Sequence, residues 1–524
     1  MTVAPRRTGV LIVGSGIMGS IVARLLRESD PALEITMVDG GSPIGEAPGV
    51  HLHDIDDPDL WSRYNAKVAT GIQGMYTGAE VVREVPGNLS ELSPGMFHAL
   101  ALGEDAEAMP AAALAWNAGG MGVHWTAATP SPSEDEAFDF GDPAAWAADV
   151  ETARRVLAVS PVAIGPTEVG ELVLSVLRRR YDGVGPDERR PQPMPMAVAT
   201  PTASGPLPRT APGTIFPAIA TGTDPAFTLV TGTLATALTM QDGRVTGARL
   251  REVAGGVEGA DGAESEIRAD AVVVCADAFR TPQLLFASGI RPEALGRYLN
   301  EHAFISARVL LDLDRFGLDL DRLPLPRAGE FSTDSLWLPR NGAEQPYHGQ
   351  IMNRTYVDDG GSPLAHSVGL SLYVPVASRP ENRLVFSRSE TDLAGLPRIG
   401  IEFEYCDEDR ALIDRALDEV RSIAEEFGPF DPETECALLS PGSSLHATGT
   451  VRAGLADDGA SVCDPDGRVW GHDNLYLAGN GVIPTAMAAN VTLTGAVTAV
   501  RAARAVAAAT AARSSTERRE EVRS

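Results

Sequence analysis

The chain starts with an apolar run that leads straight into a glycine motif, and this junction restricts the possible folds more than any other segment. Residues 10–13 are Val-Leu-Ile-Val, which is typical of a buried parallel strand. Three glycines follow at the spacing that turns such a strand into a helix: Gly14, Gly16 and Gly19. A second strand-like run ends at Asp39, about 20 residues further on, where a carboxylate can accept hydrogen bonds from ribose hydroxyls. The segment therefore predicts a dinucleotide-binding unit with the pyrophosphate at the helix N-terminus.

Strand and helix signals return far downstream, so this nucleotide-binding fold is predicted to be discontinuous. Strand-like runs lie at residues 229–230, 233–235, 245–250, 271–276 and 474–481, and an alanine-rich helix is expected over 492–508. A simple nicotinamide dehydrogenase completes its nucleotide domain within about a hundred residues, which this chain does not do. Three separated pieces suit an extended FAD lying across them. Two unrelated α/β domains are the alternative.

We predict an α/β fold, α+β overall, with a Rossmann-type discontinuous FAD-binding domain and an antiparallel-sheet substrate domain. The predicted FAD-binding domain covers residues 1–142, 216–290 and 436–512, and the substrate-binding domain covers 143–215 and 291–435. The second domain is expected to hold a helix at 169–180 and strands near 307–313, 368–374 and 398–405. The acidic segment 133–142 is interpreted as a solvated loop, and residues 513–524 as a mobile tail.

The composition excludes some classes of partner. The formal net charge is −28 at pH 7, so the molecule as a whole repels nucleic acids and anionic membrane surfaces. No stretch approaches the roughly 20 apolar residues of a membrane span, and residues 10–13 are too short for the apolar core of a signal peptide. We therefore expect a cytoplasmic enzyme without a nucleic-acid or membrane partner.

A second glycine turn combines unusual residue types in one short segment. Residues 119–126 read Gly-Gly-Met-Gly-Val-His-Trp-Thr. The glycines allow the backbone to approach a ligand closely, and His124, Trp125 and Thr126 supply a ring nitrogen, an aromatic wall and a hydroxyl. The simpler alternative is a buried turn before a strand.

The candidate chemistry lies near the C-terminus. His446 precedes the last predicted strand, and Asn490 lies just before Thr492, which opens the long helix. If that helix points its N-terminus at a flavin, its partial positive charge stabilises the reduced ring. A neutral imidazole can take a hydroxyl proton while the adjacent carbon gives hydride to the flavin, and an amide can hold the same oxygen. Taken alone, His446 is equally consistent with a structural histidine.

Several of these motifs together resemble the glucose-methanol-choline oxidoreductase superfamily. The resemblance rests on the first glycine motif, on Thr-Pro-Gln-Leu-Leu at 281–285, and on residues 481–486 with Asn490. More narrowly, three segments are similar to pyranose 2-oxidases and their bacterial glycoside 3-oxidase relatives: 119–130, 192–197 and 381–386.

This resemblance implies FAD-dependent oxidation of a secondary hydroxyl of a pyranose to a ketone, with electrons passing to O2, which gives H2O2, or to a quinone. It implies that His446 is the base and Asn490 its partner. It also matches His124 to the histidine that carries the flavin covalently in the fungal enzymes, and Thr126 to a residue near the reactive edge. The full set predicted to bind FAD is Gly14, Gly16, Gly19, Asp39, Gly120, Met121, His124, Trp125, Thr126, Thr233, Leu234, Asn480, Gly481 and Thr492.

The chain departs from the fungal pattern in two places. Gly122 and Val123 replace a more polar pair ahead of His124, which leaves covalent attachment of the flavin open. The chain is also shorter before Glu381, where the fungal enzymes carry a mobile substrate loop. A more open site favours oxidation at C3 of a glycoside over C2 of a free sugar such as glucose.

Other interpretations lead to different functions. His51, His53 and Asp54 have the residue types of metal ligands but lie in one polar loop without a further convergent partner, so no metal site is expected. A related flavoenzyme could use the same geometry on a non-sugar alcohol. A non-catalytic binding protein with a dinucleotide fold is a more remote alternative.

Overall fold

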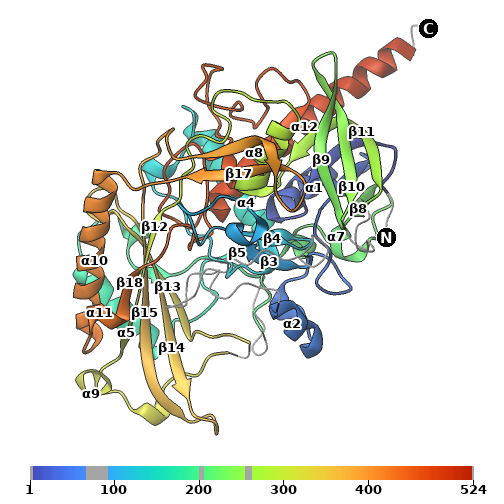
Figure 1. The fold of residues 1–524 in the computed structure, drawn as a ribbon. Helices are drawn as coiled ribbons and strands as arrows, with labels where there is room; N and C mark the ends of the chain where they lie inside the picture. The colour runs from blue at the N-terminus through green and yellow to red at the C-terminus, as the bar shows by residue number, and fades with distance from the viewer. Residues whose placement is uncertain (1–3, 67–92, 200–205, 254–261, 328, 522–524) are drawn as a thin grey trace.

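A computed structural model describes the chain except for residues 1–3, 67–92, 200–205, 254–261, 328 and 522–524. Two large sheets organise it (Figure 1). The first has seven strands in the order β8-β2-β1-β11-β10-β9, with β19 added alongside β11. Their bounds are β1 Arg7–Val13, β2 Ile35–Val38, β8 Phe227–Val230, β9 Thr233–Gln241, β10 Arg244–Glu252, β11 Glu264–Val274 and β19 Leu475–Leu477. Strands β8, β2, β1, β11 and β19 are parallel, whereas β9 and β10 complete the sheet as an antiparallel hairpin.

The central strand β1 is apolar on both faces because helices cover both sides of the sheet. Val10 and Ile12 face a core formed with α1 (Ile17–Ser29), α4 (Pro143–Leu157) and α12 (Thr492–Glu521). Leu11 and Val13 face the opposite core, which includes α8 (Asp277–Ala287). This alternation explains why the strand reads as a continuous apolar run, as is usual in a parallel sheet buried on both faces.

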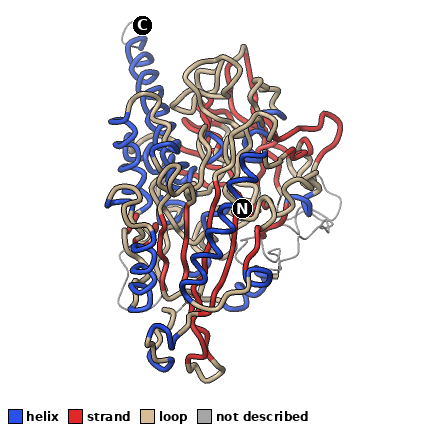
Figure 2. Tube along the Cα trace, turned by 90° about the vertical axis from the view of Figure 1, so that its left-hand side faces the viewer, coloured by secondary structure: helices blue, strands red, loops and turns tan. Residues whose placement is uncertain are grey.

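The second sheet is antiparallel throughout and has the order β18-β12-β15-β14-β13-β6. Its bounds are β6 Gln192–Pro193, β12 Ala303–Leu310, β13 Asp334–Leu338, β14 His348–Val357, β15 Pro363–Val374 and β18 Cys436–Leu438. Helices α5 (Glu168–Arg180) and α10 (Asp407–Phe427) share one apolar core with it. Figure 2 shows long strands lying side by side in this part of the molecule.

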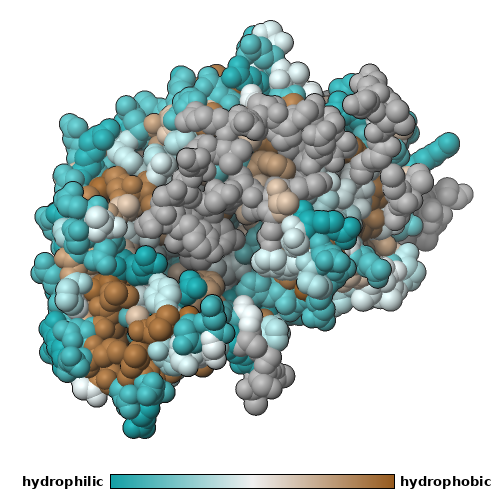
Figure 3. All heavy atoms as spheres, turned by 60° about the horizontal axis from the view of Figure 1, so that its bottom comes forward, coloured by the Kyte–Doolittle hydropathy of each residue, from teal (hydrophilic) through white to brown (hydrophobic). Residues whose placement is uncertain are grey.

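The outer part of this sheet leaves apolar side chains at the surface. In β12, Val309 is fully buried against the helices, whereas the next residue, Leu310, is 50% exposed. Large apolar side chains near the strand ends are exposed too: Leu325, Val357, Leu364 and Leu438. Figure 3 shows apolar side chains gathered on one part of this face of the molecule.

Shorter elements connect the two sheets. The remaining strands are β3 Gly95–His98, β4 Ala113–Trp116, β5 Val159–Ser160, β7 Met196–Ala197, β16 Arg383–Thr391 and β17 Pro397–Glu402. The remaining helices are α2 Pro58–Asn65, α6 Pro212–Ile215, α7 Ala218–Thr221, α9 Leu313–Phe316 and α11 Pro432–Glu435. Within the described residues, no helix has the length and apolarity needed to cross a bilayer.

The predicted fold class is confirmed, and one local interpretation needs revision. The segment 133–142 is not a solvated loop, because Ser133, Glu136 and Phe138 are buried and Glu136 is fully so. One of its acidic residues, Glu136, accepts hydrogen bonds from backbone N–H groups inside the protein, as described below. Residues 513–521 of the segment expected as a mobile tail continue α12 as helix, and their Arg and Glu residues are good helix formers; the mobility of the tail stays a prediction. The domain boundaries themselves remain a prediction.

Candidate active site

The first glycine turn is shaped by close backbone packing. Gly14 has φ +103°, and a Cβ there would lie 2.4 Å from the carbonyl oxygen of Cys275. A Cβ on Gly19 would lie 2.1 Å from the carbonyl oxygen of Gly14, so α1 packs directly on the turn. Gly16 forms the N-cap of α1, and no side chain caps the helix there. The first N–H groups of α1 therefore open onto the adjacent cavity, where they suit a phosphate.

Asp39 holds the same turn from the end of β2. Its Oδ2 accepts hydrogen bonds from the Ser15 N–H (2.8 Å) and hydroxyl (2.6 Å), and its Oδ1 accepts from Gly41 N–H (2.8 Å). Burial raises the pKa of Asp39, although these hydrogen bonds favour its charged form. Asp39 also lines the cavity, where the carboxylate has remaining lone pairs for ribose hydroxyls.

His124 lies at the end of the second glycine turn, and its shortest polar contacts with two neighbours are made through Nε2. Its Nε2 is 2.9 Å from Asn117 Oδ1 and 2.8 Å from the Tyr64 hydroxyl, and its ring stacks on Tyr64. Asn117 Nδ2 donates to the Gly120 carbonyl (3.1 Å), which directs Oδ1 towards His124. The proton is therefore assigned to Nε2 of His124, which donates to Asn117. Burial lowers the His124 pKa to about 3, so the ring is neutral.

The histidines of the polar loop 51–54 support this turn. His51 Nε2 lies 3.0 Å from the Trp125 carbonyl oxygen, and the Trp125 indole donates to the Thr210 carbonyl (2.7 Å). His53 Nδ1 contacts Arg209 (2.7 Å), whose guanidinium pairs with buried Glu330. The loop therefore braces the wall formed by Trp125.

His446 is presented by a loop that a buried carboxylate holds. Glu301 accepts hydrogen bonds from Gly442 N–H (2.5 Å), the Ser444 hydroxyl (2.7 Å) and His446 N–H (3.2 Å). Burial raises the pKa of Glu301, while these donors favour its charged form. Burial also lowers the pKa of His446 to about 4, so its ring is neutral at pH 7 and can accept a proton.

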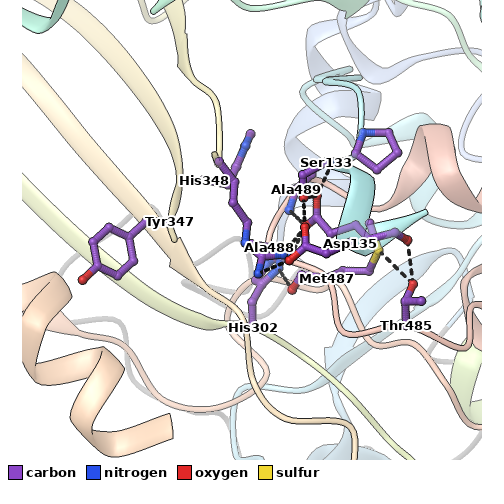
Figure 4. A network of polar contacts seen from close by, with 12 residues as sticks. Ser133, Asp135, His302, Tyr347, His348, Thr485, Met487, Ala488 and Ala489 are labelled. Carbon is purple, nitrogen blue, oxygen red and sulfur yellow. Dashed lines mark hydrogen bonds and ion pairs between the residues drawn. The ribbon is translucent and has the colours of Figure 1, made fainter. Parts of the chain in front are cut away.

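Asn490 lies at the end of another loop that is held by a glutamate. Glu136 Oε1 accepts from Ala488 N–H (2.5 Å) and Ala489 N–H (2.9 Å), and its backbone carbonyl accepts from the Thr485 hydroxyl (2.7 Å) (Figure 4). Glu136 Oε2 accepts from Ser133 N–H (2.6 Å) and hydroxyl (2.8 Å). Residues 485–490 are thus fixed by a carboxylate that is distant in sequence.

His348 on β14 orients the Asn490 amide. The Trp337 indole can only donate, and it reaches His348 Nδ1 at 3.0 Å. His348 therefore carries its proton on Nε2 and donates to Asn490 Oδ1 at 2.9 Å. This contact leaves the Asn490 Nδ2 group as a donor towards the cavity, which Asn490 lines. Burial lowers the pKa of His348 to about 3, consistent with a neutral ring.

A third buried histidine, His302, precedes β12 and lies between the two loops. Its Nε2 is 2.8 Å from His446 Nδ1, and its Nδ1 is 3.3 Å from the Met487 carbonyl oxygen. Figure 4 shows His302 beside Met487 and His348. Sequence reasoning missed His302, His348, Glu301 and Glu136, because their partners are distant in sequence. The local signal was weak: His302 directly precedes a largely apolar strand, whereas His348 begins a strand of mixed polarity.

One cavity joins these groups from the first glycine turn to the C-terminal loops. Most of the residues predicted from the sequence line it: Gly14, Gly16, Asp39, Gly120, Met121, His124, Trp125, Thr126, Thr233, Leu234, His446, Asn480, Asn490 and Thr492. Gly19 and Gly481 lie beside it, where each allows close packing: Gly19 on the Gly14 carbonyl and Gly481 on Thr450 and Val451. Glu301, Phe304, Gln350 and Tyr373 complete its wall near His446.

The residues around the cavity fit a flavin dinucleotide. The uncapped start of α1 and the open glycine turns suit a pyrophosphate. Within the described part of the chain, the buried Oδ1 of Asn480 has no hydrogen-bond partner, although Asn480 lines the cavity. Thr492 starts α12 at the same cavity, so the positive end of that helix faces the ligand space.

Comparisons with known proteins show which family this chain resembles. The sequence profiles of the GMC oxidoreductase family match residues 219–304 and 378–499. A C-glycoside 3-oxidase from Microbacterium trichothecenolyticum is 36% identical over 95% of this chain and 96% of that protein. A C-glycoside 3-oxidase from Arthrobacter globiformis is 37% identical over 95% of this chain and 94% of that protein. A pyranose 2-oxidase from Emericella nidulans is 26% identical over 94% and 91%, respectively.

Solved structures share the fold at low sequence identity. A formate oxidase variant from Aspergillus oryzae superposes with a TM-score of 0.63 at 14% identity, covering 97% of this chain and 99% of that one. Pyridoxine 4-oxidase from Mesorbium loti gives a TM-score of 0.57 at 17% identity, covering 95% and 98%.

Proposed function

Because this chain belongs to the GMC oxidoreductase family and is an FAD-dependent oxidoreductase of CH–OH donors, we propose that it oxidises a secondary hydroxyl of a pyranose to a ketone. The preferred position is C3 of a glycoside, and C2 of a free sugar is the alternative. The observation that carries the proposal is that His446 and Asn490 meet at one cavity with complementary roles. His446 is a neutral acceptor and Asn490 presents a donor.

FAD supplies the hydride acceptor. Backbone groups at Gly14, Gly16 and the start of α1 would hold its pyrophosphate, and Asp39 a ribose. The turn at 119–126 would hold the isoalloxazine end. We propose that the flavin is bound without a covalent bond, because Nε2 of His124 carries a proton and donates to Asn117. The Nε2 nitrogen in that state has no lone pair available to attack the flavin methyl group, and the lone pair of the neutral ring lies on Nδ1, 3.5 Å from the Tyr64 hydroxyl.

His446 would take the proton of the reacting hydroxyl. Its low pKa keeps the ring unprotonated at neutral pH, and a positioned general base of this kind typically contributes about 10² to 10⁴-fold in rate. The Asn490 Nδ2 group would donate to the same oxygen as negative charge develops on it, while His348 holds the amide in the required orientation. The hydrogen on the adjacent carbon leaves as hydride, which balances the loss of the proton.

The wall near His446 suits an uncharged sugar. Phe304 and Tyr373 offer apolar faces, and Gln350 offers an amide that can bond sugar hydroxyls. The C-glycoside 3-oxidases among the relatives favour a glycoside and position C3. The pyranose 2-oxidase relative keeps free sugars and C2 as the second candidate. The electrons would pass to O2, giving H2O2, or to a quinone.

The test is flavin bleaching without oxygen. Purified holoprotein is mixed anaerobically with matched free sugars, O-glycosides and C-glycosides, and the keto position of the product is assigned by NMR. We expect bleaching by pyranosides and a 3-keto product, and loss of bleaching but not of bound flavin in His446→Gln. Bleaching only by non-sugar alcohols would overturn the proposed substrate class. Adding either air or a quinone to the bleached enzyme then identifies the acceptor, because the true acceptor restores the yellow colour.

A further inference from the structure

We propose that His302 is a positioning residue that fixes the tautomer of His446, because His302 Nε2 accepts a hydrogen bond from the Nδ1–H of His446 and leaves Nε2 of His446 as the acceptor in the cavity. This inference rests on the proposed role of His446 as the base. A histidine acts as a base only through a nitrogen that carries no proton, so the identity of that nitrogen decides whether the ring is competent.

The protonated nitrogens of both histidines can be assigned from one neighbour that can only accept a hydrogen bond. The Met487 carbonyl oxygen can only accept, so His302 must carry its proton on Nδ1, 3.3 Å from that oxygen. His302 Nε2 is then an acceptor. It lies 2.8 Å from His446 Nδ1, which must therefore be the donor of that hydrogen bond. Nε2 of the neutral His446 ring is left with its lone pair.

The opposite tautomer meets a penalty in this environment. With its proton on Nε2, His446 would direct a lone pair at the lone pair of His302 Nε2 across 2.8 Å. If His302 changed tautomer to relieve that contact, its Nδ1 lone pair would face the Met487 oxygen. His302 is 3% exposed, so water has little access to these nitrogens. Either arrangement leaves buried polar atoms without a partner.

The packing around His302 keeps this geometry rigid. Its ring meets His446 edge-on, with centroids 4.9 Å apart at 81°, and lies 4.7 Å from the Tyr373 ring. The preceding residue, Glu301, accepts hydrogen bonds from the backbone of the His446 loop. Two consecutive residues thus hold the backbone and the ring of the same histidine. The titratable groups facing the pair are Glu301, His348 and Tyr373.

The hydrogen-bonded chain also ends at Met487. A carbonyl oxygen accepts a hydrogen bond but does not take up a proton at neutral pH, so His302 has no base to which it can pass one. A proton taken from the sugar hydroxyl at Nε2 therefore stays within the His446–His302 pair, where the hydrogen bond between His446 Nδ1 and His302 Nε2 stabilises the imidazolium.

The first test reads the tautomer without turnover. FAD-loaded protein labelled with ¹⁵N-histidine is studied by two-bond ¹H–¹⁵N NMR in the absence of substrate, and His446→Gln identifies the His446 signals. We expect wild-type His446 to show a protonated Nδ1 and an unprotonated Nε2. Finding the proton on Nε2 in the wild type would overturn the proposal, whatever any variant does.

The second test compares two replacements of His302. Leucine removes the acceptor, and we expect the Nε2–H form to become populated and the rate of anaerobic flavin reduction to fall about 10- to 100-fold, as an unpaired buried donor implies. Glutamine can place an amide oxygen near the Nε2 position, so His302→Gln should keep the Nδ1–H tautomer and rates within a few-fold of wild type. The sugar Kd should change little in either variant.

The matched control is His366→Leu. His366 is another buried histidine of the same sheet, but it bonds to Thr355 and does not line the cavity. Its replacement should leave the His446 tautomer and the flavin-reduction rate unchanged. If His302→Leu keeps both the wild-type tautomer and the wild-type rate, the role of His302 is refuted. If His446→Gln reduces flavin at the wild-type rate, the proposed function fails instead, and the NMR result still stands on its own.

Discussion

Replacing Glu136 with glutamine tests whether a remote carboxylate sets the position of Asn490. Each carboxylate oxygen accepts two hydrogen bonds, one pair from Ala488 and Ala489 and the other from Ser133. Glutamine keeps one acceptor oxygen but replaces the other with an NH2 group, which would face the N–H or O–H donors of the surrounding residues. Because hydrogen bonds to a charged group contribute about 1.5–3 kcal/mol each, we expect the free energy of unfolding to fall by about 2–4 kcal/mol.

The functional effect should be larger than the effect on cofactor retention. A displacement of about 1 Å at a reacting group can cost on the order of 100-fold in rate, so we expect flavin reduction to slow by about 10- to 100-fold. Stopped-flow bleaching gives this rate, and flavin release in urea gives the stability. Glu134→Gln removes the same charge from an exposed neighbour and is the control. If both variants reduce flavin equally fast, Glu136 does not hold the Asn490 loop.

Three further outcomes follow from the site. Burial lowers the His446 pKa to about 4, so the unprotonated base form predominates above that pH. The rate of flavin reduction should therefore be constant from about pH 8 to 5 and fall as the pH drops through about 4. A break in the rate near the ordinary histidine pKa of about 6.5 would contradict this expectation. Acid precipitation should release the yellow colour into the supernatant, whereas colour retained in the pellet would show that His124 has formed a covalent bond. Gly14→Ala should abolish FAD retention because the new Cβ would strike the Cys275 carbonyl. The control is Gly103→Ala, because Gly103 also has a positive φ but has open space around it. Equal losses of flavin from both variants would point to backbone strain rather than to the packing of the glycine turn.

The parts of the fold that could be predicted are those with local causes. Residues 10–39 form strand, turn, helix and strand as expected, because each step depends on neighbouring residues. The chemistry of His446 and Asn490 alone left a structural histidine equally possible, and the resemblance favoured their role as base and partner. The residues that orient them could not be found this way, since His302 and His348 gain their roles from partners more than 140 positions away. Glu136 was misinterpreted because three adjacent acidic residues look solvated in a sequence, and only the fold shows that one of them points inward.

The position of α12 against α1 has a consequence for the synthesis of this protein. Chains leave the ribosome N-terminus first, so β1 and α1 emerge long before the last strand and helix. The core around Ile21 of α1 is completed by Leu493, Val497 and Val500 of α12, and β19 pairs with β11 only at the end. Until these residues are made, the face of α1 is uncovered. The cavity wall at Asn480 and Thr492 is therefore complete only after these residues are made, and a chain truncated before Thr492 presents an unfinished core to chaperones and proteases.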